Sequence, residues 1–473
     1  MFIYWFFFSL YCLTALVIGF WPSKKKTKDD CFWTAGRNLN GFSAGISISA
    51  GFMSVSWSCV YAVQLFYWYG VGAIWIMTIP WLLSLGLIYV LASRYRKLSA
   101  FSQPEMVGNA FGESTKRWVA VALIFVFLVW GGAEIFIAAK LLAPGLGIST
   151  ALTIFLISLV VGLYSSAGGF GAVVSTDKLQ YTLVALYILI IAGLAYVGLG
   201  DEVSIKVLIS QRGMKDTGVS HILFSPGILI IATTFLAYIP GWAFETDLWI
   251  RVQASRDPAA AKKSILFAGI NAFLFVGVIP LFIGLSALQI FPAVNGSYPE
   301  ILGYEGDAIF SALVGQFAPS WVIPILILGL VAAAMSTIDT CVHVIALGLS
   351  YDLKIIPKHK HRTSVIIAVL ASFIFALNAD SLWDIFYLSS GILTTAVAFP
   401  VAAIFISNVN KNGVTWSSAF GLIGTIMSYF LEKHSILDML LPAALAGSGL
   451  GFILIGILLA ILGYLIGRSS LVS

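Results

Sequence analysis

The residues best suited to chemistry in this chain are polar groups inside long apolar stretches. Residues 332–340 read Ala-Ala-Ala-Met-Ser-Thr-Ile-Asp-Thr, which puts three hydroxyls and a carboxylate on consecutive helical turns. An aspartate inside a membrane costs roughly 2.5–3.5 kcal/mol, so Asp339 is expected to face protein or water. Hydroxyls bonded back to their own helix are the simpler explanation for Ser336, Thr337 and Thr340. With Asp339 beside them, the hydroxyls predict a hard-cation site built from oxygen ligands.

Two other segments carry residues that interrupt helices. The segment 45–51 combines small residues, hydroxyls and two glycines, and the segment 238–242 contains Pro240 and Gly241. A glycine costs about 1 kcal/mol against alanine in a helix interior, and proline removes an amide donor. Close helix packing explains the first segment on its own, and a simple kink explains the second. Because the two lie five spans apart, they favour two broken helices in an inverted-repeat transporter with its site at the midplane.

Further polar residues have a functional and a simpler interpretation. Asp177 lies just before an apolar stretch, where an ion pair with Lys178 at the membrane surface is the alternative to a role in ion binding. Five residues of the two interrupted segments are the expected wall of a solute cavity, although packing explains each of them equally well: Ser47, Ser49, Gly51, Tyr238 and Trp242.

The elements that must position these groups are membrane-spanning helices. The chain has 473 residues, of which 60% are hydrophobic and 10% charged. Soluble domains are about 45–50% apolar and about 25% charged, so a secreted enzyme, a nucleic-acid binder and a disordered scaffold are excluded. The four cysteines show no disulfide or metal-ligand spacing. Thirteen apolar stretches have membrane length: 2–20, 41–67, 71–92, 118–142, 150–165, 179–199, 226–247, 264–288, 313–346, 363–379, 383–407, 413–431 and 437–466.

The distribution of positive charge predicts the orientation. With the N-terminus outside and the C-terminus cytoplasmic, the inward segments hold 21 of the 26 Lys and Arg residues, and the reverse orientation would invert that ratio. The first stretch lacks a basic start and a small-residue cleavage site, so it is expected to be a retained span and not a signal peptide. The inward segments are Lys24–Arg37, Arg94–Arg117, Lys178, Arg251–Lys263, Lys354–Arg362, Lys411 and Arg468.

The spans divide into two halves of five. Residues 1–40 supply an extra N-terminal span and a basic cytoplasmic loop, and residues 411–473 supply two C-terminal spans. Between them, residues 41–200 form the first five-helix repeat and residues 225–410 the second. Since five is odd, the second repeat would insert upside down relative to the first, as an inverted-repeat transporter requires.

Several motifs in this order resemble the sodium/solute symporter family, which includes sodium-coupled carriers for proline, pantothenate and sugars. Residues 164–172 read Tyr-Ser-Ser-Ala-Gly-Gly-Phe-Gly-Ala and precede Thr176, Asp177 and Gln180, as in the family signature. Residues 333–340 are similar to the family's Ala-x-Met-Ser-Thr-Ala-Asp-Ser. Other matches cover most of the chain: Gly36-Arg37, Arg251 with the loop to Lys263, and Asn408–Gly413.

The resemblance implies a leucine-transporter-like inverted repeat with sodium as the coupling ion and no other cofactor. Carbonyl and hydroxyl oxygens can replace the hydration shell of sodium. By position, the first sodium site would comprise the carbonyls of Gly45, Ile48 and Ala333 with the hydroxyls of Ser336 and Thr337. Some relatives carry a second sodium, whose ligands would correspond to Asp177, Ser336, Asp339 and Thr340.

These observations predict a sodium-coupled symporter in the plasma (inner) membrane, with membrane lipid around it and no nucleic-acid or obligate protein partner. Pro240 and Gly241 stand where sugar-carrying relatives place aromatic gates, which favours a small organic solute such as an amino acid or another carboxylate. A proton-coupled permease using Asp177 or Asp339 is one alternative, and a transporter-like sensor or receptor is another. An enzyme is not expected, because the intramembrane His343 has no obvious catalytic partner, and ATP is not expected to drive transport, because no GxxxxGK[ST] loop is present.

Overall fold

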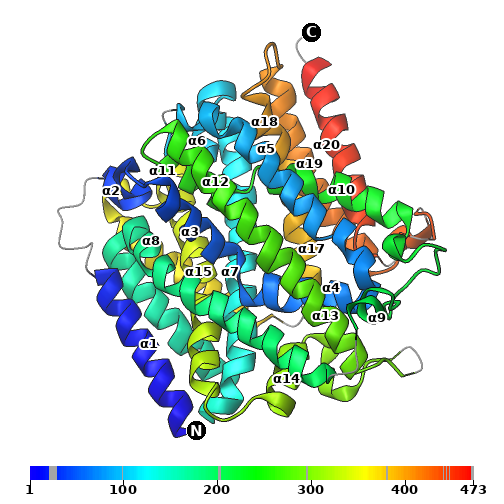
Figure 1. Ribbon diagram of the computed structural model, residues 1–473. Coiled ribbons are helices and arrows are strands. Elements are labelled where there is room, and N and C mark those ends of the chain that lie inside the picture. The colour runs from blue at the N-terminus through cyan, green and yellow to red at the C-terminus, as the bar shows by residue number, and fades with distance from the viewer. Residues whose placement is uncertain are drawn as a thin grey trace.

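The computed structural model describes residues 1–20, 29–98, 100–200, 204–294, 297–379, 382–439, 441–443, 445–446 and 448–469. Within these ranges every regular element is a helix, apart from two isolated β-bridges. The predicted all-α membrane fold is therefore confirmed (Figure 1). The part of the predicted basic loop that runs from Lys24 to Lys28 lies outside the described residues.

Each of the thirteen predicted stretches overlaps a described helix, but the stretch 313–346 begins before α15 (Ile323–Leu347) and the stretch 437–466 before α20 (Gly451–Ser469), with residues 440, 444 and 447 outside the described ones. Ten helices are long and apolar enough to span a membrane, and one bent pair brings the number to eleven. The long helix α8 (Thr150–Leu199) contains two predicted stretches, divided at Gly169, where φ is 58°. A shorter apolar helix, Tyr387–Ala403, contains another. Outer members of the bundle are α1 (Phe2–Phe20), α5 (Thr78–Arg96), α16 (His361–Leu377), α19 (Lys411–Lys433) and α20 (Gly451–Ser469).

The first broken span consists of α3 (Gly41–Phe52), a π-helical segment (Val55–Tyr61) and α4 (Ala62–Tyr69), with a bend of 61°. The break follows Phe52, so the expectation that the helix unwinds within residues 45–51 is wrong. The helix resumes at Ser54, whose hydroxyl accepts a hydrogen bond from the amide of Trp57. This serine is a typical N-cap, because its oxygen satisfies an amide that has no partner inside the helix.

The second interrupted span consists of α10 (Ile228–Ala243) and α11 (Thr246–Ala254), which together form one span without the strong bend of the first. The helix continues through Pro240 because the side chain of Thr394 bridges its backbone. The Thr394 hydroxyl accepts a hydrogen bond from the amide of Gly241 at 3.1 Å and donates one to the carbonyl of Ala237. In a regular helix this amide and this carbonyl would bond to each other. Insertion of a side chain into the backbone ladder is a recognised cause of helix distortion. The chain then leaves the helix at Phe244 and Glu245, one turn later than predicted.

Helix α15 (Ile323–Leu347) lies in the core of the bundle. In its most apolar window 78% of the residues are buried, against 28% for α1 at the periphery. It packs against α8, α3 and α7 (Glu113–Leu146). Helices α12 (Pro258–Ala272) and α13 (Ile279–Ile290) cover α3 and α4 from another side (Figure 1). Shorter helices complete the fold: α2 (Asp29–Thr34), α6 (Gln103–Phe111), α9 (Ile205–Ile209), α14 (Ile309–Phe317), α17 (Leu382–Ile392) and α18 (Phe399–Ala403).

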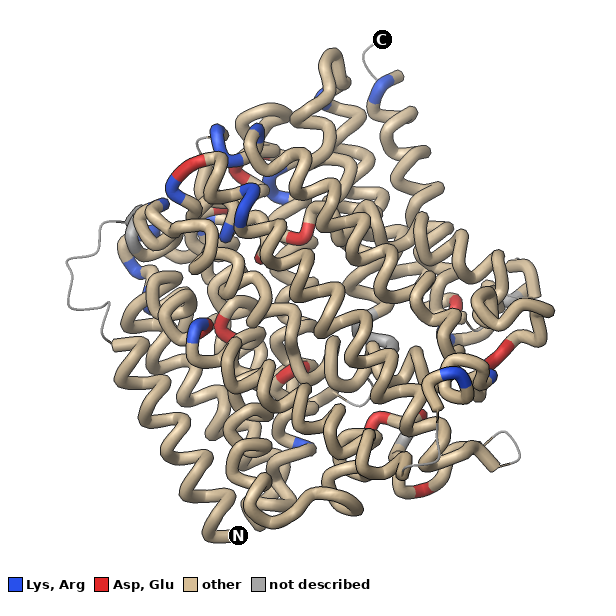
Figure 2. Tube along the Cα trace, viewed as in Figure 1, with Lys and Arg blue, Asp and Glu red and all other residues tan. Residues whose placement is uncertain are grey.

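The two termini lie at opposite ends of the bundle, and positive charge gathers at one of them. Figure 2 shows many of the Lys and Arg residues around the end of α5, the start of α12 and the C-terminus. Far fewer lie at the end where the N-terminus is found. This asymmetry agrees with the charge pattern read from the sequence.

Candidate functional site

The end of α3 and the middle of α15 meet through hydrogen bonds between residues far apart in the sequence. The Ser336 hydroxyl lies 2.9 Å from the carbonyl oxygen of Ala50, and the Thr337 hydroxyl lies 2.9 Å from that of Gly51. These carbonyls belong to the last turn of α3, where the break removes their partners within the helix. The carbonyl of Phe52 accepts instead from the Ser58 hydroxyl at 2.8 Å. The predicted meeting of these two segments therefore exists.

The carbonyls at this junction differ in part from those predicted. Gly45 lies more than a turn before Ala50, its carbonyl accepts from the Ser49 hydroxyl at 2.9 Å, and its α-carbon faces Phe267 of α12. Ile48 also precedes the two carbonyls that Ser336 and Thr337 contact. The α3 carbonyls that Ser336 and Thr337 contact are therefore those of Ala50 and Gly51, because the helix continues to Phe52, and the assignment of Gly45 and Ile48 to sodium stays a prediction.

The junction presents oxygens suited to a small hard cation. The Ser336 hydroxyl also lies 2.9 Å from the carbonyl of Ala333, so that two carbonyls and one hydroxyl converge there. The end of α3 adds the partial negative charge of a helix C-terminus. All of these residues except Thr337 are buried. The chemistry matches that of sodium, which binds carbonyl and hydroxyl oxygens without strong directional preference.

A network of ion pairs lies beside this junction. The Arg251 guanidinium is fully buried, with its Nη2 3.4 Å from Asp177 and 2.9 Å from the Thr340 hydroxyl. Its Nε donates to the Ser47 hydroxyl at 2.7 Å, and Ser47 donates in turn to Asp177. Arg251 was expected in a cytoplasmic loop. The structure corrects this, because α11 carries the residue into the core, where Asp247 of α11 and Asp177 of α8 hold it.

The four residues predicted for a second sodium are close together but already engaged. Asp177 and Thr340 contact Arg251, and Asp339 accepts from the Tyr164 hydroxyl at 2.8 Å. The fourth, Ser336, belongs to the junction with α3. The alternative in which Asp177 pairs with Lys178 does not occur, because Lys178 is exposed while Asp177 is buried against Arg251.

A buried carboxylate caps the helix that resumes after the break. Glu134 of α7 accepts from the amides of Val55 and Ser56 at 2.7 and 3.1 Å, and also from the Ser56 hydroxyl. A negative group at a helix N-terminus is stabilised by the free amides and by the helix dipole. Glu134 is absent from the residues predicted from the sequence, although an acidic residue within a predicted span is itself a signal of function.

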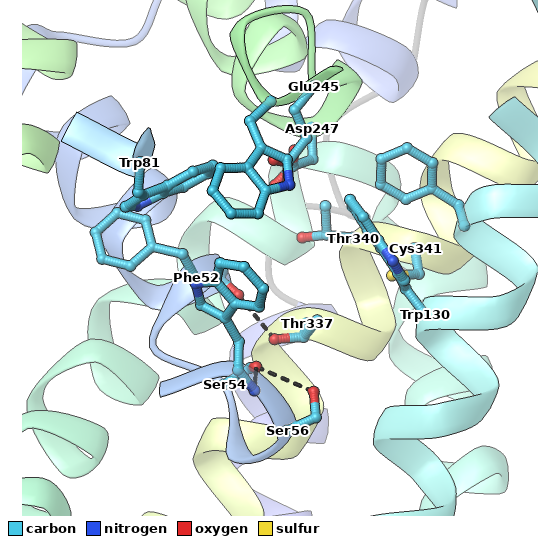
Figure 3. Close-up of a pocket in the computed structure, with 14 residues that line it drawn as sticks. Phe52, Ser54, Ser56, Trp81, Trp130, Glu245, Asp247, Thr337, Thr340 and Cys341 are labelled. Atoms are coloured by element: carbon cyan, nitrogen blue, oxygen red, sulfur yellow. Dashed lines mark hydrogen bonds between the residues drawn. The ribbon is translucent and has the colours of Figure 1, made fainter. Parts of the chain in front are cut away.

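A cavity opens beside the break and the junction. The empty space within it and at its open mouth is about 590 Å³, and two carboxylates, Glu245 and Asp247, lie close together on one side of it (Figure 3). Aromatic rings and small polar groups form the rest of its wall. The aromatic residues that line the cavity are Phe52, Trp57, Trp81, Phe127, Trp130 and Trp242, and Gly51 and Thr337 line it at the junction.

Only part of the predicted solute wall lines this cavity. Gly51 and Trp242 do so. Tyr238 stands behind the wall, stacked on Trp242 with ring centroids 4.8 Å apart. Ser47 belongs to the Arg251 network, and Ser49 bonds back to its own helix. His343 packs against aromatic rings and lies 3.0 Å from the carbonyl oxygen of Trp33.

Comparisons with known proteins agree with this architecture. The model of the sodium:solute symporter family matches residues 32–421. The chain is 22% identical to the sodium/proline symporter of Salmonella typhimurium over 95% of its own length and 92% of that protein. It is 25% identical to the sodium/pantothenate symporter of Haemophilus influenzae over 67% and 64% of the two chains. A match to sodium/glucose cotransporter 1 of Sus scrofa covers 29% of that longer protein.

Solved structures show the same fold. A sodium-coupled sialic acid symporter in a substrate-bound, outward-open state has a TM-score of 0.75 at 18% identity, over 99% of this chain and 98% of that one. The nucleobase-cation-symport-1 family transporter Mhp1 has a TM-score of 0.58 at 13% identity, over 92% and 93%. The predicted leucine-transporter-like architecture is thereby confirmed.

The fold and the broken-helix site define a multi-pass membrane transporter and not an enzyme. The extent of the family match places this chain in the sodium:solute symporter family, whose members couple sodium to a small solute.

Proposed function

We propose that this protein is a sodium-coupled symporter that imports a small organic solute by alternating access. Sodium binds at the junction of α3 and α15 and stabilises the arrangement in which the adjoining cavity receives the solute. The observation that carries the proposal is the convergence of the Ser336 and Thr337 hydroxyls on the end of α3, at 2.9 Å from two backbone carbonyls. Family membership and the fold support sodium as the coupling ion.

The proposed ligands of this sodium are the carbonyls of Ala50 and Ala333 and the hydroxyls of Ser336 and Thr337, with Gly51 as a neighbouring carbonyl. When sodium is absent, the hydroxyls donate to the carbonyls, and when it binds, their lone pairs turn toward the ion. The set Asp177, Ser336, Asp339 and Thr340 is retained as a second sodium site. Because Arg251 contacts two of its members, a second ion would have to displace the guanidinium.

We further propose that the N-terminus lies outside and the C-terminus in the cytoplasm of the plasma (inner) membrane. The repeats 41–200 and 225–410 would then be inverted relative to each other around the site. The charge asymmetry of the bundle and the matching breaks after α3 and α10 support this arrangement.

The double substitution S336A/T337A tests the sodium site. We expect sodium-dependent uptake into proteoliposomes to be lost, while membrane insertion and folding persist. A matched control is S166A/T182A, since both hydroxyls are exposed and bond only to their own helix. Unchanged sodium dependence of uptake in S336A/T337A would exclude this site.

A further inference from the structure

We infer that the imported solute is an organic cation, bound in the cavity by its aromatic rings and by Glu245 and Asp247. This inference rests on the proposed function and specifies the solute class of the same site. Four features of the cavity lead to it: the aromatic rings, the unpaired oxygen of Asp247, the balance of buried charge and the occupation of the nearest anion site.

Three indole rings form one corner of the cavity and stand nearly edge-on to one another. The ring centroids of Trp57 and Trp242 are 5.2 Å apart at 89°, and those of Trp81 and Trp242 are 5.7 Å apart at 83°. Trp57 and Trp81 are 6.1 Å apart at 66°. All three tryptophans line the cavity, so they offer it aromatic surface of the kind that binds ammonium groups through cation–π interactions.

The two carboxylates share a hydrogen bond with each other, and among the described residues one oxygen of Asp247 lacks a partner of its own. Glu245 and Asp247 are each only 8% exposed. Within the described part of the chain, Oδ1 of Asp247 has no hydrogen-bond partner. The nearest cation is Arg251, whose Nη1 is 3.9 Å from Oδ2 of Asp247 and which also pairs with Asp177. Burial of an unpaired carboxylate is costly, so a cationic solute beside Glu245 and Asp247 would relieve that cost.

The balance of buried charge also favours a positively charged solute. Around the cavity and the adjoining junction, the described residues include five buried carboxylates and one guanidinium, that of Arg251. One sodium ion leaves this region negative even if one carboxylate is protonated. A cationic solute brings the charge nearer to neutrality, whereas an anionic solute increases the imbalance. The five carboxylates are Glu134, Asp177, Glu245, Asp247 and Asp339.

The position where an anionic solute would bind is already occupied. Transporters with broken helices direct a half-helix N-terminus at the anionic group of the substrate. In this chain the N-terminus that follows the first break is capped by Glu134, which accepts from the amides of Val55 and Ser56. A solute carboxylate would compete with Glu134 for the same amides. The preference for a carboxylate solute that the sequence suggested therefore has no support in the charges of the cavity.

Competition with chosen probes tests the solute class in the full-length protein in proteoliposomes with a sodium gradient. Choline provides a quaternary ammonium, and tyramine provides a primary ammonium on an aromatic ring. We expect one or both to be taken up in a sodium-dependent manner, and glucose, proline and pantothenate not to compete. Dependence on Asp247 should be greater for tyramine, whose N–H groups can donate to Oδ1, while choline should depend more on the indoles.

The variant E245Q/D247N should weaken the apparent affinity for the cationic probe at least tenfold. The matched control is E113Q, because Glu113 begins α7 with a side chain that is 62% exposed and does not line the cavity. If E245Q/D247N fails to fold, the competition of choline and tyramine for uptake by the unaltered protein decides whether the solute is a cation. Sodium-driven uptake of glucose, proline or pantothenate without competition by choline or tyramine would overturn the inference, as would the absence of uptake of both cations.

Sodium binding in the absence of solute separates this inference from the proposed function. A sodium-dependent rise in the temperature of thermal unfolding, lost in S336A/T337A, supports the coupling site whatever the solute. If that rise is present and only uncharged or anionic solutes are transported, the cationic solute class is wrong and the symport mechanism stands. If sodium changes neither unfolding nor uptake, the symport mechanism itself is wrong.

Discussion

At the scale of single residues, the contact between Arg251 and Asp177 holds together helices α11 and α8. Both side chains are fully buried, and Nη2 of Arg251 is 3.4 Å from Oδ2 of Asp177. Removal of one partner from a buried pair leaves an uncompensated charge, which costs about 3–5 kcal/mol. We therefore expect R251M and D177N each to lower stability strongly, and R251M/D177N to lose much less than the sum of the two.

The midpoint of thermal unfolding in detergent measures this coupling. The pair Lys140–Asp307 serves as the control, because its atoms approach to 2.8 Å while the lysine side chain is 48% exposed. Exposed ion pairs contribute about 0–1 kcal/mol, so K140M/D307N should show little coupling. If the effects of R251M and D177N simply add, Arg251 does not hold its position through Asp177.

At the scale of elements, the break inside α8 depends on a glycine. Gly169 has a φ of 58°, and a β-carbon there would lie 2.6 Å from the carbonyl oxygen of Phe32. Such a backbone conformation costs a non-glycine residue about 1–3 kcal/mol, and the clash adds to that. We expect G169A to lower the unfolding temperature and the yield of folded protein.

The control for this substitution lies in the same helix. Gly193 is exposed, has helical backbone angles and has open space where a β-carbon would stand. Alanine is favoured over glycine inside helices by up to about 1 kcal/mol, so G193A should leave stability unchanged or raise it slightly. Equal effects of G169A and G193A would contradict a specific role for the break.

The same scale shows what the sequence could predict. Runs of apolar residues of membrane length identified the helices, because lipid requires every span to satisfy its own backbone. The breaks were expected in the correct spans but too early. In α3 the small residues serve close packing, as at Gly45 against Phe267, while the break itself is marked by the N-cap Ser54. In α10 the helix continues past Pro240 because the hydroxyl of Thr394, far away in the sequence, hydrogen-bonds to the amide of Gly241 and the carbonyl of Ala237.

Partners across long sequence distances explain what the sequence missed at the site. The contact of Ser336 with the carbonyl of Ala50 joins residues 286 positions apart. No local pattern indicates which carbonyl a distant hydroxyl will reach. Arg251 was assigned to a loop because positive residues usually stay outside the membrane, and only its buried partners make the core position tolerable. The residue types of the sodium site could be predicted, while their exact partners required the fold.

At the scale of the whole molecule, the distribution of charge predicts which surface faces the cytoplasm. We expect a membrane-impermeant maleimide applied to intact cells to label S210C, in the polar segment before α10, and not K358C, in the basic segment before α16. Permeabilised cells should label both. Of the four native cysteines, Cys12, Cys59 and Cys341 are buried, and the labelled variants carry C31S so that the introduced thiol is the one tested. Labelling of K358C alone in intact cells would reverse the proposed orientation.

The same whole-molecule view fixes how much work one transport cycle can do. A charge crossing 100 mV is worth about 2.3 kcal/mol, and a tenfold sodium gradient adds about 1.4 kcal/mol. One sodium with a neutral solute therefore supplies about 3.7 kcal/mol, while one sodium with a monovalent organic cation supplies about 6 kcal/mol, enough for roughly 10,000-fold accumulation.

We expect two charges to move for each molecule of solute. Simultaneous measurement of current, ²²Na⁺ flux and solute uptake in the same proteoliposomes checks this expectation. One sodium and two charges per solute would agree with the scheme, while two sodium ions and two charges would indicate a neutral solute and an ion bound in place of the Arg251 contacts. One charge per cationic solute, with no sodium flux, would mean that the membrane potential alone drives uptake and that the junction of α3 and α15 does not couple it to sodium.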